Sequence, residues 1–429
     1  MKLSELTGIE QTLSSGLRLL ALPQPAVHRA VVHAQIRVGS RFESPSDNGV
    51  SHFLEHVLYR GTKEFPSAHE LAREIERWGG SLDAATAADA GTLSLTAPPE
   101  NLERLIPIFA EVFQRPILQG LDIERGIVRE ELLEGLDEAG ASIDADDLIR
   151  ECSFEGHGLG QPIAGTLTQL ETFDRPKLFT HHARHYTAVN SVLVASGNLD
   201  AERILAALSA NFDGLPEGAP TLVQAPAAQQ QARFSFVRNS GSQTQLRIAF
   251  RAPGWDSADE AAMEVLARLM DDGMSTRLYR RLCDELGLCY EVSGGYEVYT
   301  DAGLLELHAE TSHENALRVL GEIFNLVRDL RDRGPEASEL QAVLQRYRWQ
   351  AEGMLDDPYV IADFAADALQ GERPWSIAHQ VERLAGVTQE RLRNVAERWL
   401  TAANLSVVLV GAPSRADARA AEQLLQRFA

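Results

Sequence analysis

The strongest constraint on the fold is an internal repeat that divides the chain in half. Residues 186–197 (YTAVNSVLVASG) and 400–411 (LTAANLSVVLVG) share Thr, Ala, Asn and Gly at a constant offset of 214 in a chain of 429 residues. Each stretch has the pattern of a helix end, a turn and a buried strand that stops at Gly. Self-similarity at a fixed offset indicates duplication, so the sequence predicts two homologous domains.

A segment rich in Pro, Gly, Ala and Gln lies between the two copies. Residues 216–231 show no hydrophobic periodicity, which is typical of a linker. The predicted domains are therefore residues 1–215 and residues 232–429, joined by residues 216–231.

Strand and helix signals are mixed within each half. Residues 30–38 form a β-rich run, and Leu93 and Leu95 alternate with polar residues as in a half-exposed strand. Ser67 followed by Glu70 resembles a capping box ahead of an amphipathic helix. This succession predicts an α+β fold in which each domain is a mostly antiparallel sheet packed with helices, the two domains facing each other across a cleft.

Composition narrows the function. The net charge of −22 argues against nucleic-acid binding and leaves either a solvated acidic surface or selection of basic peptides. The N-terminal residues lack the apolar stretch of a secretory signal, and no apolar run could cross a bilayer, so no membrane insertion is expected. Three cysteines without metal-type spacing (Cys152, Cys283 and Cys289) suit a reducing, cytoplasmic location.

The sequence HFLEH at residues 52–56 is the main chemical motif. Asp47 or Asn48 can cap a helix that runs through His52 and His56 and ends near Gly61. Residues four apart lie on one helical face, so both imidazoles can reach a single ion, and imidazole suits Zn²⁺.

Glu55 stands directly before His56, where a carboxylate can take a proton from a metal-bound water. The spacing H-x-x-E-H reverses the commoner H-E-x-x-H and is the inverzincin signature. The alternative interpretation is a partly exposed helix whose histidines only cap or contact solvent.

A third ligand is expected from the sequence ERGIVREEL at residues 124–132. Glu124 and Glu131 are seven residues apart, two helical turns, and share a face. One carboxylate on the metal and another behind it is an arrangement that zinc sites use to orient ligands. Taken alone, this acidic helix would be a solvated surface.

These motifs together resemble the pitrilysin/insulinase family of zinc metallopeptidases, in a half-length form similar to the subunits of mitochondrial processing peptidase. The family has a glutamate ligand about 75 residues after H-x-x-E-H, preceded seven positions earlier by a second glutamate. The resemblance implies that His52, His56 and Glu131 bind one Zn²⁺ per chain. It also implies that Glu55 is the general base, and that Glu124 contacts a metal ligand and orients it without binding the metal.

Two further assignments follow from the resemblance. Glu130 is the rival ligand if the register slips by one. Residues 79–86 (GGSLDAAT) are similar to the family's strand whose edge pairs with substrate. The implied substrate-binding residues are Asp83, Ala84, Ala85 and Thr86. Asp83 replaces the usual Asn, and the alternative for this segment is a plain edge strand.

The second half lacks the metal motif. The offset of 214 places Leu266, Leu269 and Met270 where His52, Glu55 and His56 stand, and Gln345 where Glu131 stands. The second copy is therefore expected to have no zinc site and to form a wall that faces the substrate.

The family also places an Arg and a Tyr from its zinc-free part against the substrate carbonyl. Tyr290, Tyr296 and Tyr299 are available here, with Tyr290 and Tyr299 as the candidates, but no Arg occurs between Arg281 and Arg318. The resemblance therefore implies a homo- or heterodimer in which a related half-length subunit supplies the pair.

The expected function is a zinc-dependent endopeptidase subunit that hydrolyses extended peptides or unfolded segments inside a closed chamber. Two alternatives stay open at this point. The chain could be a non-catalytic core or assembly subunit of a larger complex, or a peptide-binding module whose zinc is only structural.

Overall fold

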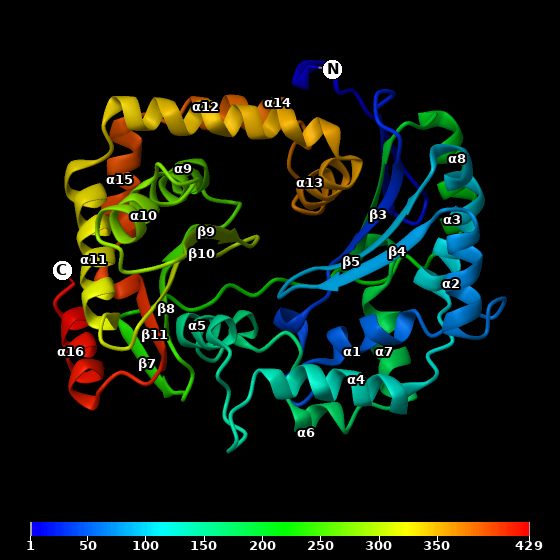
Figure 1. Ribbon diagram of the computed structural model, residues 1–429. Helices are drawn as coiled ribbons and strands as arrows, with labels where there is room; N and C mark the ends of the chain where they lie inside the picture. Colours follow the sequence, from blue (N-terminus) through cyan, green and yellow to red (C-terminus); the bar gives the residue numbers. More distant parts are fainter. Residues whose placement is uncertain (1, 429) are drawn as a thin grey trace. The chain divides into compact units, whose positions relative to one another are not determined.

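The computed structural model describes residues 2–428, which pack into two compact units (Figure 1). Unit 1 comprises the described parts of Met1–Leu132, Gln161–Leu222 and Trp349–Gln380. Unit 2 comprises the described parts of Leu133–Gly160, Val223–Arg348 and Val381–Ala429. Each unit is one sheet packed with helices, which confirms the α+β prediction.

Unit 1 is built on a sheet with the strand order β1-β2-β6-β3-β5-β4. Only β2 and β6 run parallel, and the other neighbours are antiparallel. Its strands are β1 (Ile9–Thr12), β2 (Arg18–Pro23), β3 (Ala30–Ile36), β4 (Ser81–Thr86), β5 (Gly91–Ala97) and β6 (Ser191–Gly197). Its helices are α1 (Val50–Leu58), α2 (Ala68–Arg77), α3 (Pro99–Gln114), α4 (Leu121–Glu134), α6 (Leu167–Leu170), α7 (Arg175–His185), α8 (Ala201–Phe212) and α13 (Pro358–Gln370).

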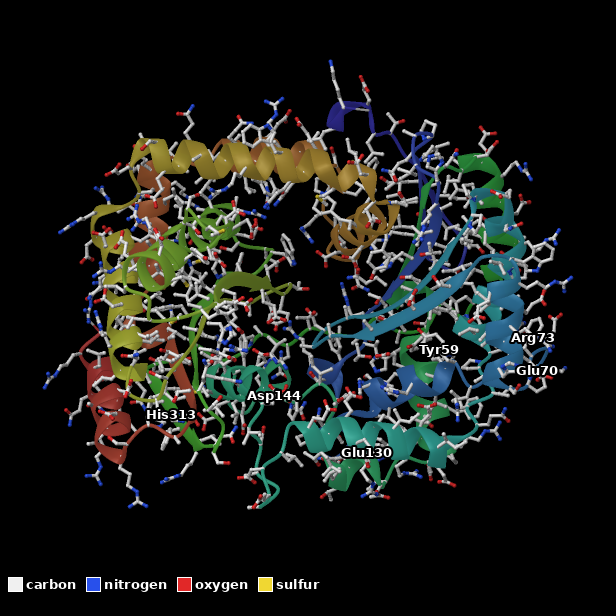
Figure 2. The ribbon with its side chains drawn as sticks, viewed as in Figure 1. Tyr59, Glu70, Arg73, Glu130, Asp144 and His313 are labelled. Carbon is white, nitrogen blue, oxygen red and sulfur yellow. The ribbon has the colours of Figure 1, made fainter. Side chains whose placement is uncertain are left out.

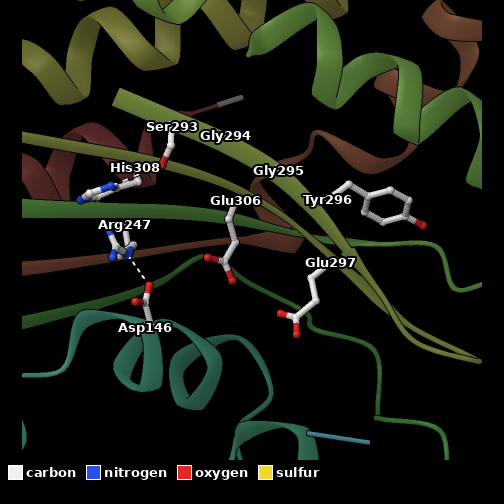
Figure 3. A pocket seen from close by; sticks show the side chains of 9 residues that line it. All are labelled: Asp146, Arg247, Ser293, Gly294, Gly295, Tyr296, Glu297, Glu306 and His308. Carbon is white, nitrogen blue, oxygen red and sulfur yellow. Dashed lines mark hydrogen bonds and ion pairs between the residues drawn. The ribbon is translucent and has the colours of Figure 1, made fainter. Parts of the chain in front are cut away.

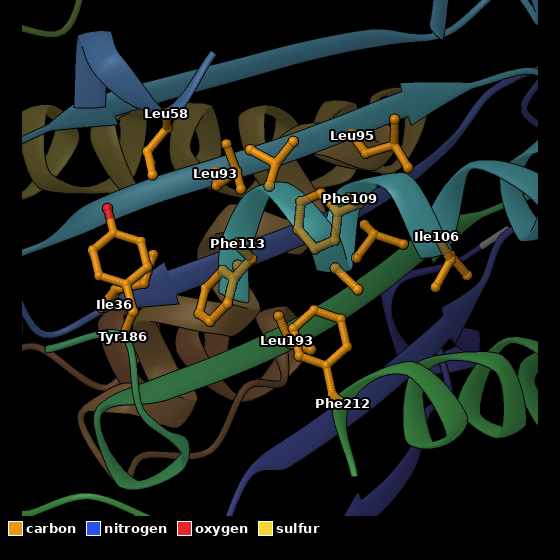
Figure 4. Close-up of a cluster of buried hydrophobic side chains, with 14 of the residues drawn as sticks. Ile36, Leu58, Leu93, Leu95, Ile106, Phe109, Phe113, Tyr186, Leu193 and Phe212 are labelled. Atoms are coloured by element: carbon orange, nitrogen blue, oxygen red, sulfur yellow. The ribbon is translucent and has the colours of Figure 1, made fainter. Parts of the chain in front are cut away.

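The core of unit 1 lies between this sheet and helices such as α3 and α8 (Figure 4). The ring of Phe212 packs there against Phe109 and edge-on against Phe113, with centroids 6.2 and 5.5 Å apart. The strands predicted at residues 30–38 and around Leu93 are β3 and β5. Leu93 is buried, as predicted, and Thr92 and Thr96 are half-buried. The polar Ser94 is also buried, so the predicted half-exposure of β5 was wrong at this residue, because α13 covers part of the other face of the sheet.

The helix predicted after Ser67 is α2. The hydroxyl of Ser67 accepts a hydrogen bond from the backbone N–H of Glu70 and donates one to its carboxylate. Leu71 and Ile75 of α2 are buried, as the amphipathic pattern predicts.

Unit 2 contains a second sheet with the order β7-β11-β8-β10-β9. Its strands are β7 (Arg233–Arg238), β8 (Thr244–Ala252), β9 (Val292–Val298), β10 (Gly303–Thr311) and β11 (Leu405–Gly411). Its α-helical segments, two of which extend into unit 1, are α5 (Ala145–Ser153), α9 (Glu260–Met270), α10 (Arg277–Tyr279), α11 (Ala316–Arg333), α12 (Ala337–Gly353), α14 (Ile377–Ala385), α15 (Gln389–Trp399) and α16 (Arg415–Gln426).

The internal repeat corresponds to equivalent strands. β6 and β11 each follow a short 3-10 turn, Ala188–Asn190 and Ala402–Asn404, and each lies between a parallel and an antiparallel neighbour. β6 ends at Gly197, whose φ of 120° is a conformation that favours glycine. The predicted duplication of one sheet-and-helix design is confirmed.

The two units exchange one helix each along the chain. α13 comes from the second half of the sequence but packs on β3 and β6 of unit 1, and α5 comes from the first half but packs on β8 and β11 of unit 2. Arg18 donates to the carbonyl of Leu369, and Arg37 donates to that of Gln370 at 2.8 Å. Both arginines thus bind the C-terminal end of α13, where the helix dipole favours positive charge.

The segment between the sequence repeats, residues 216–231, contains neither helix nor strand. The three cysteines are free thiols in the structure. Within the described chain, no helix has both the length and the apolar character that crossing a bilayer requires.

Candidate metal centre

The motif helix α1 is held at its start by a buried carboxylate. Gly49 adopts a left-handed conformation (φ 91°) and leads into the helix at Val50. Glu43 accepts hydrogen bonds from the backbone N–H groups of Gly49 and Ser51, at 2.7 and 2.8 Å. Burial raises the pKa of this carboxyl, although its hydrogen bonds oppose the rise.

The predicted cap at Asp47 or Asn48 was therefore wrong. Asp47 instead forms an ion pair with Lys177, and Asn48 donates to the Glu43 carboxylate. The turn at Gly49 places the first helical residue after both side chains, so a carboxylate from the preceding loop binds the free N–H groups instead. The helix ends at Leu58, three residues before Gly61.

Three side chains converge between α1 and α4. The Nε2 atom of His52 lies 3.4 Å from Oε1 of Glu131, and Nε2 of His56 lies 3.6 Å from Oε2 of the same carboxylate. One ligand-type atom from each residue lies within 4.8 Å of the others. Two imidazole nitrogens and a carboxylate oxygen are a donor set that fits Zn²⁺.

His52 and Glu131 shift each other's pKa. Burial alone would lower the pKa of His52, but the hydrogen bond and the charge of Glu131 raise it above its usual value. The hydrogen bond from His52 in turn lowers the pKa of Glu131. The site therefore keeps its carboxylate ionised.

Glu124 and Arg60 lie on the Nδ1 side of the His56 ring. Glu124 places Oε2 3.4 Å from Nδ1 of His56, and its other oxygen lies 3.1 Å from Nε of Arg60. Glu124 is 6% exposed, whereas Glu131, two helical turns further along the same face of α4, is exposed. Arg60 was not predicted; it lies in the turn after α1, two residues beyond the helix end at Leu58, where helical periodicity gives no signal.

Glu55 faces the edge strand. Thr86, the last residue of β4, donates a 2.7 Å hydrogen bond from its hydroxyl to Oε2 of Glu55. Tyr59 and Tyr186 lie close enough that burial and then the charge of Glu55 raise the pKa of both phenols. Neither tyrosine was predicted from the sequence.

The strand β4 is at the edge of the sheet, as predicted, and its one pairing partner among residues 2–428 is β5. Asp83 and Ala85 are exposed, and Ala84 and Thr86 are half-buried. Glu130, the rival ligand, is exposed on α4 (Figure 2) and does not belong to the group that His52, His56 and Glu131 form.

Comparison with known proteins now identifies the family. The profile described as "Insulinase (Peptidase family M16)" matches residues 19–167, which include His52, His56 and Glu131, and "Peptidase M16 inactive domain" matches residues 172–347. The chain belongs to the insulinase-type M16 peptidase family.

Other proteins are similar to this chain along most of their length. An uncharacterised zinc protease of Rickettsia bellii is 28% identical over 323 residues, 74% of this chain and 76% of the relative. One from Mycobacterium tuberculosis is 27% identical over 404 residues, 91% of this chain and 90% of the relative. A protease from Helicobacter pylori has the same fold, with a TM-score of 0.86 at 19% identity, covering 94% of this chain and 99% of the other.

The second half carries apolar residues at the positions 214 residues after His52, Glu55 and His56. Leu266, Leu269 and Met270 of α9 are all buried in the core of unit 2, and Gln345 lies on α12. Across residues 2–428, the only group of three or more His, Cys, Asp or Glu side chains arranged to hold a metal ion is the one in unit 1.

Unit 2 instead contains a polar pocket of about 510 Å³ beside β9 (Figure 3). Asp146 of α5 pairs with Arg247 of β8 at 2.7 Å in this pocket. Burial, and then the charge of Glu297, raises the pKa of Glu306 there to about 7.

The tyrosines proposed to contact substrate differ in exposure. Tyr290 is 93% exposed, whereas Tyr299 is 3% exposed and packs edge-on against Phe154. Tyr296 donates a hydrogen bond to the carbonyl of Pro253. The burial of Tyr299 removes the physical basis for assigning it a substrate contact, while Tyr290 stays a prediction.

Proposed function

We propose that the chain is a zinc-dependent endopeptidase that hydrolyses extended peptides or unfolded segments. The convergence of His52, His56 and Glu131 within 4.8 Å is the observation that carries this proposal. Three protein ligands leave one position open, which is typical of catalytic rather than structural zinc. The similarity to proteins named zinc proteases supports the same metal.

The side chains around the site have distinct roles in the proposed mechanism. A bound Zn²⁺ would supply a nucleophilic water at neutral pH and polarise the scissile carbonyl. Glu55 accepts the proton of the attacking water on its carboxylate and delivers it to the leaving amine. Thr86 fixes the orientation of that carboxylate through its hydrogen bond to Oε2.

Glu124 acts through His56. Its oxygen 3.4 Å from Nδ1 favours the tautomer with the proton on that atom, which leaves the Nε2 lone pair free to bind a metal. Arg60 holds Glu124 in place from the other side.

Substrate binding is assigned to the free edge of β4. An extended peptide can add a strand there through backbone hydrogen bonds along residues 83–86, which asks little of its sequence. This mode of binding favours unfolded segments over folded proteins.

A second copy of the chain, or a related half-length subunit, is proposed to complete the enzyme by supplying an Arg/Tyr pair. The absence of a metal-type cluster from the described part of unit 2 supports a division of roles between copies. Light scattering combined with peptide cleavage tests this point: the active species should be at least a dimer, and a fully active monomer would refute it.

One measurement tests the main proposal. Zinc content should be one ion per chain, and cleavage of an unstructured peptide should stop with a chelator and return with Zn²⁺. An assembly subunit would bind no peptide productively, and a binding module with structural zinc would capture peptide without cutting it. Either result would overturn the proposal.

A further inference from the structure

A polar row crosses the sheet of unit 1 beside the edge strand. His33 of β3, Ser94 of β5 and Asp83 of β4 stand directly opposite one another in the register. Directly opposed residues in antiparallel strands point to the same face. Thr86 lies an odd number of positions from Asp83, so Asp83 faces away from the side on which Thr86 meets α1.

Helix α13 brings Tyr359 to this row. Its ring packs edge-on against His33, with centroids 5.6 Å apart, and its hydroxyl shares a hydrogen bond with Ser94. Ser94 also lies 2.8 Å from Nδ1 of His33. Tyr359 is nonetheless 40% exposed, so one part of the side chain is fixed and another part faces solvent.

Two carboxylates lie near this tyrosine, those of Asp83 and Asp363. No described Lys, Arg or His forms an ion pair with Asp83. The ion pair shown for Asp363 of α13 is with His33, at 3.5 Å, but burial lowers the pKa of His33 to about 4 and keeps it neutral. The phenol of Tyr359 lies in the field of both carboxylates, which add to the effect of burial in raising its pKa.

We infer that Tyr359 and Asp83 form a specificity-determining subsite for a basic side chain of a peptide bound along β4. The inference rests on the proposed function and goes beyond it by naming the substrate class. Alternate side chains of an extended peptide point to the same face as Asp83. A Lys or Arg there would meet a carboxylate and the exposed part of an aromatic ring, a combination that binds cations.

The structure also explains why the subsite depends on the second half of the chain. Tyr359 lies at the N-terminal end of α13, next to the N-cap residue Asp357. Arg18 and Arg37 bind the C-terminal end of the same helix. The ring is therefore held by contacts at both ends of the helix and does not need the substrate to position it.

The test measures binding without turnover. In a Glu55→Gln background, fluorescent peptides that carry one lysine moved stepwise through an otherwise neutral sequence are compared by anisotropy with peptides that carry norleucine instead. We expect one position at which lysine binds about fivefold to tenfold more tightly.

Substitutions test whether Asp83 and Tyr359 cause the preference for lysine. Asp83→Asn and Tyr359→Leu should each remove most of it, and Tyr359→Phe, which keeps the ring, should retain it. Asp213→Asn, a neutralisation at an exposed site of unit 1, is the charge control and should change nothing. Because Asp83 is exposed, its variant tests the inference even if a substitution of Tyr359 disturbs folding.

The two proposals fail in different ways. Wild-type protein without chelator-sensitive cleavage would refute the peptidase, whatever the binding scan shows. A flat lysine scan, or a peak that Asp83→Asn and Tyr359→Leu both leave intact, would overturn the subsite even if the wild type cleaves peptides.

Discussion

Thr86 on the edge strand β4 donates a 2.7 Å hydrogen bond to Glu55 on α1, so the strand assigned to substrate also holds the proposed base. A peptide that pairs with β4 would be placed against a carboxylate whose orientation the same strand controls. Loss of this bond frees the carboxylate to rotate.

Thr86→Val should therefore lower kcat by about tenfold, the effect of one hydrogen bond, with little change in KM or zinc content. Thr86→Ser keeps the hydroxyl and should retain most of the activity. Steady-state kinetics on one quenched peptide measures both, and an unchanged kcat in the valine variant would contradict the role given to Thr86.

Glu55→Gln should reduce turnover by about 10²-fold or more while one zinc ion per chain stays bound. Glutamine has nearly the same shape but cannot accept the proton. Elemental analysis and peptide cleavage on the same sample check this, and full cleavage by the variant would exclude Glu55 as the base.

Adjacent residues on α4 provide a matched pair. Glu131→Gln should lose zinc after dialysis, because the carboxylate that faces both imidazoles is removed. Glu130→Gln, an exposed neighbour outside the group, should keep its zinc and its activity. The reverse result would mean that the register of the ligand helix is shifted by one residue.

Glu124→Gln should weaken zinc binding by roughly 10- to 100-fold without abolishing it, since the residue orients His56 rather than contacting the metal. Competition with a chromogenic chelator gives the affinity. An affinity equal to that of the wild type would remove Glu124 from the site.

Stability should depend on pH through His33 and Asp363 in opposite directions. Burial lowers the pKa of His33 from 6.5 to about 4, so between these values the unfolded chain takes up a proton that the folded one excludes. Its contribution therefore decreases as pH falls, by about 2 kcal/mol at pH 5. Partial desolvation, and then the charge of Asp367, raise the pKa of Asp363 from 3.8 to about 6, so the folded state holds that proton and its contribution increases as pH falls.

Urea unfolding at pH 7 and pH 5 separates the two effects. The loss of unfolding free energy on acidification should be smaller in His33→Gln than in the wild type, and larger in Asp363→Asn. Equal losses in all three proteins would show that neither group has the protonation behaviour derived from its burial.

Sequence patterns were sufficient where the determinant is local. The spacing of His52 and His56 on one helical turn, and of Glu124 and Glu131 on two, fixes which faces can meet, and the structure brings these side chains together. The strand at residues 405–411 is likewise encoded by a continuous apolar run.

Determinants that are distant in sequence could not be found in this way. Glu43 binds the start of α1 from an irregular loop that has no periodic signal. The amphipathic pattern of α13 shows that one face is buried, but it carries no information on which of two similar sheets will bury it. For the same reason Tyr359 could not be connected with Asp83 before the fold was known.

The reciprocal placement of α5 and α13 limits how this enzyme can be divided. A gene fragment ending within residues 216–231 would encode a first half in which the sheet face that α13 covers, with His33 and Ser94, has lost its cover. The same fragment would carry α5 without the sheet on which it packs. Each half expressed alone is therefore expected to expose a surface that the whole chain buries, even though the proposed ligands all lie in one of them.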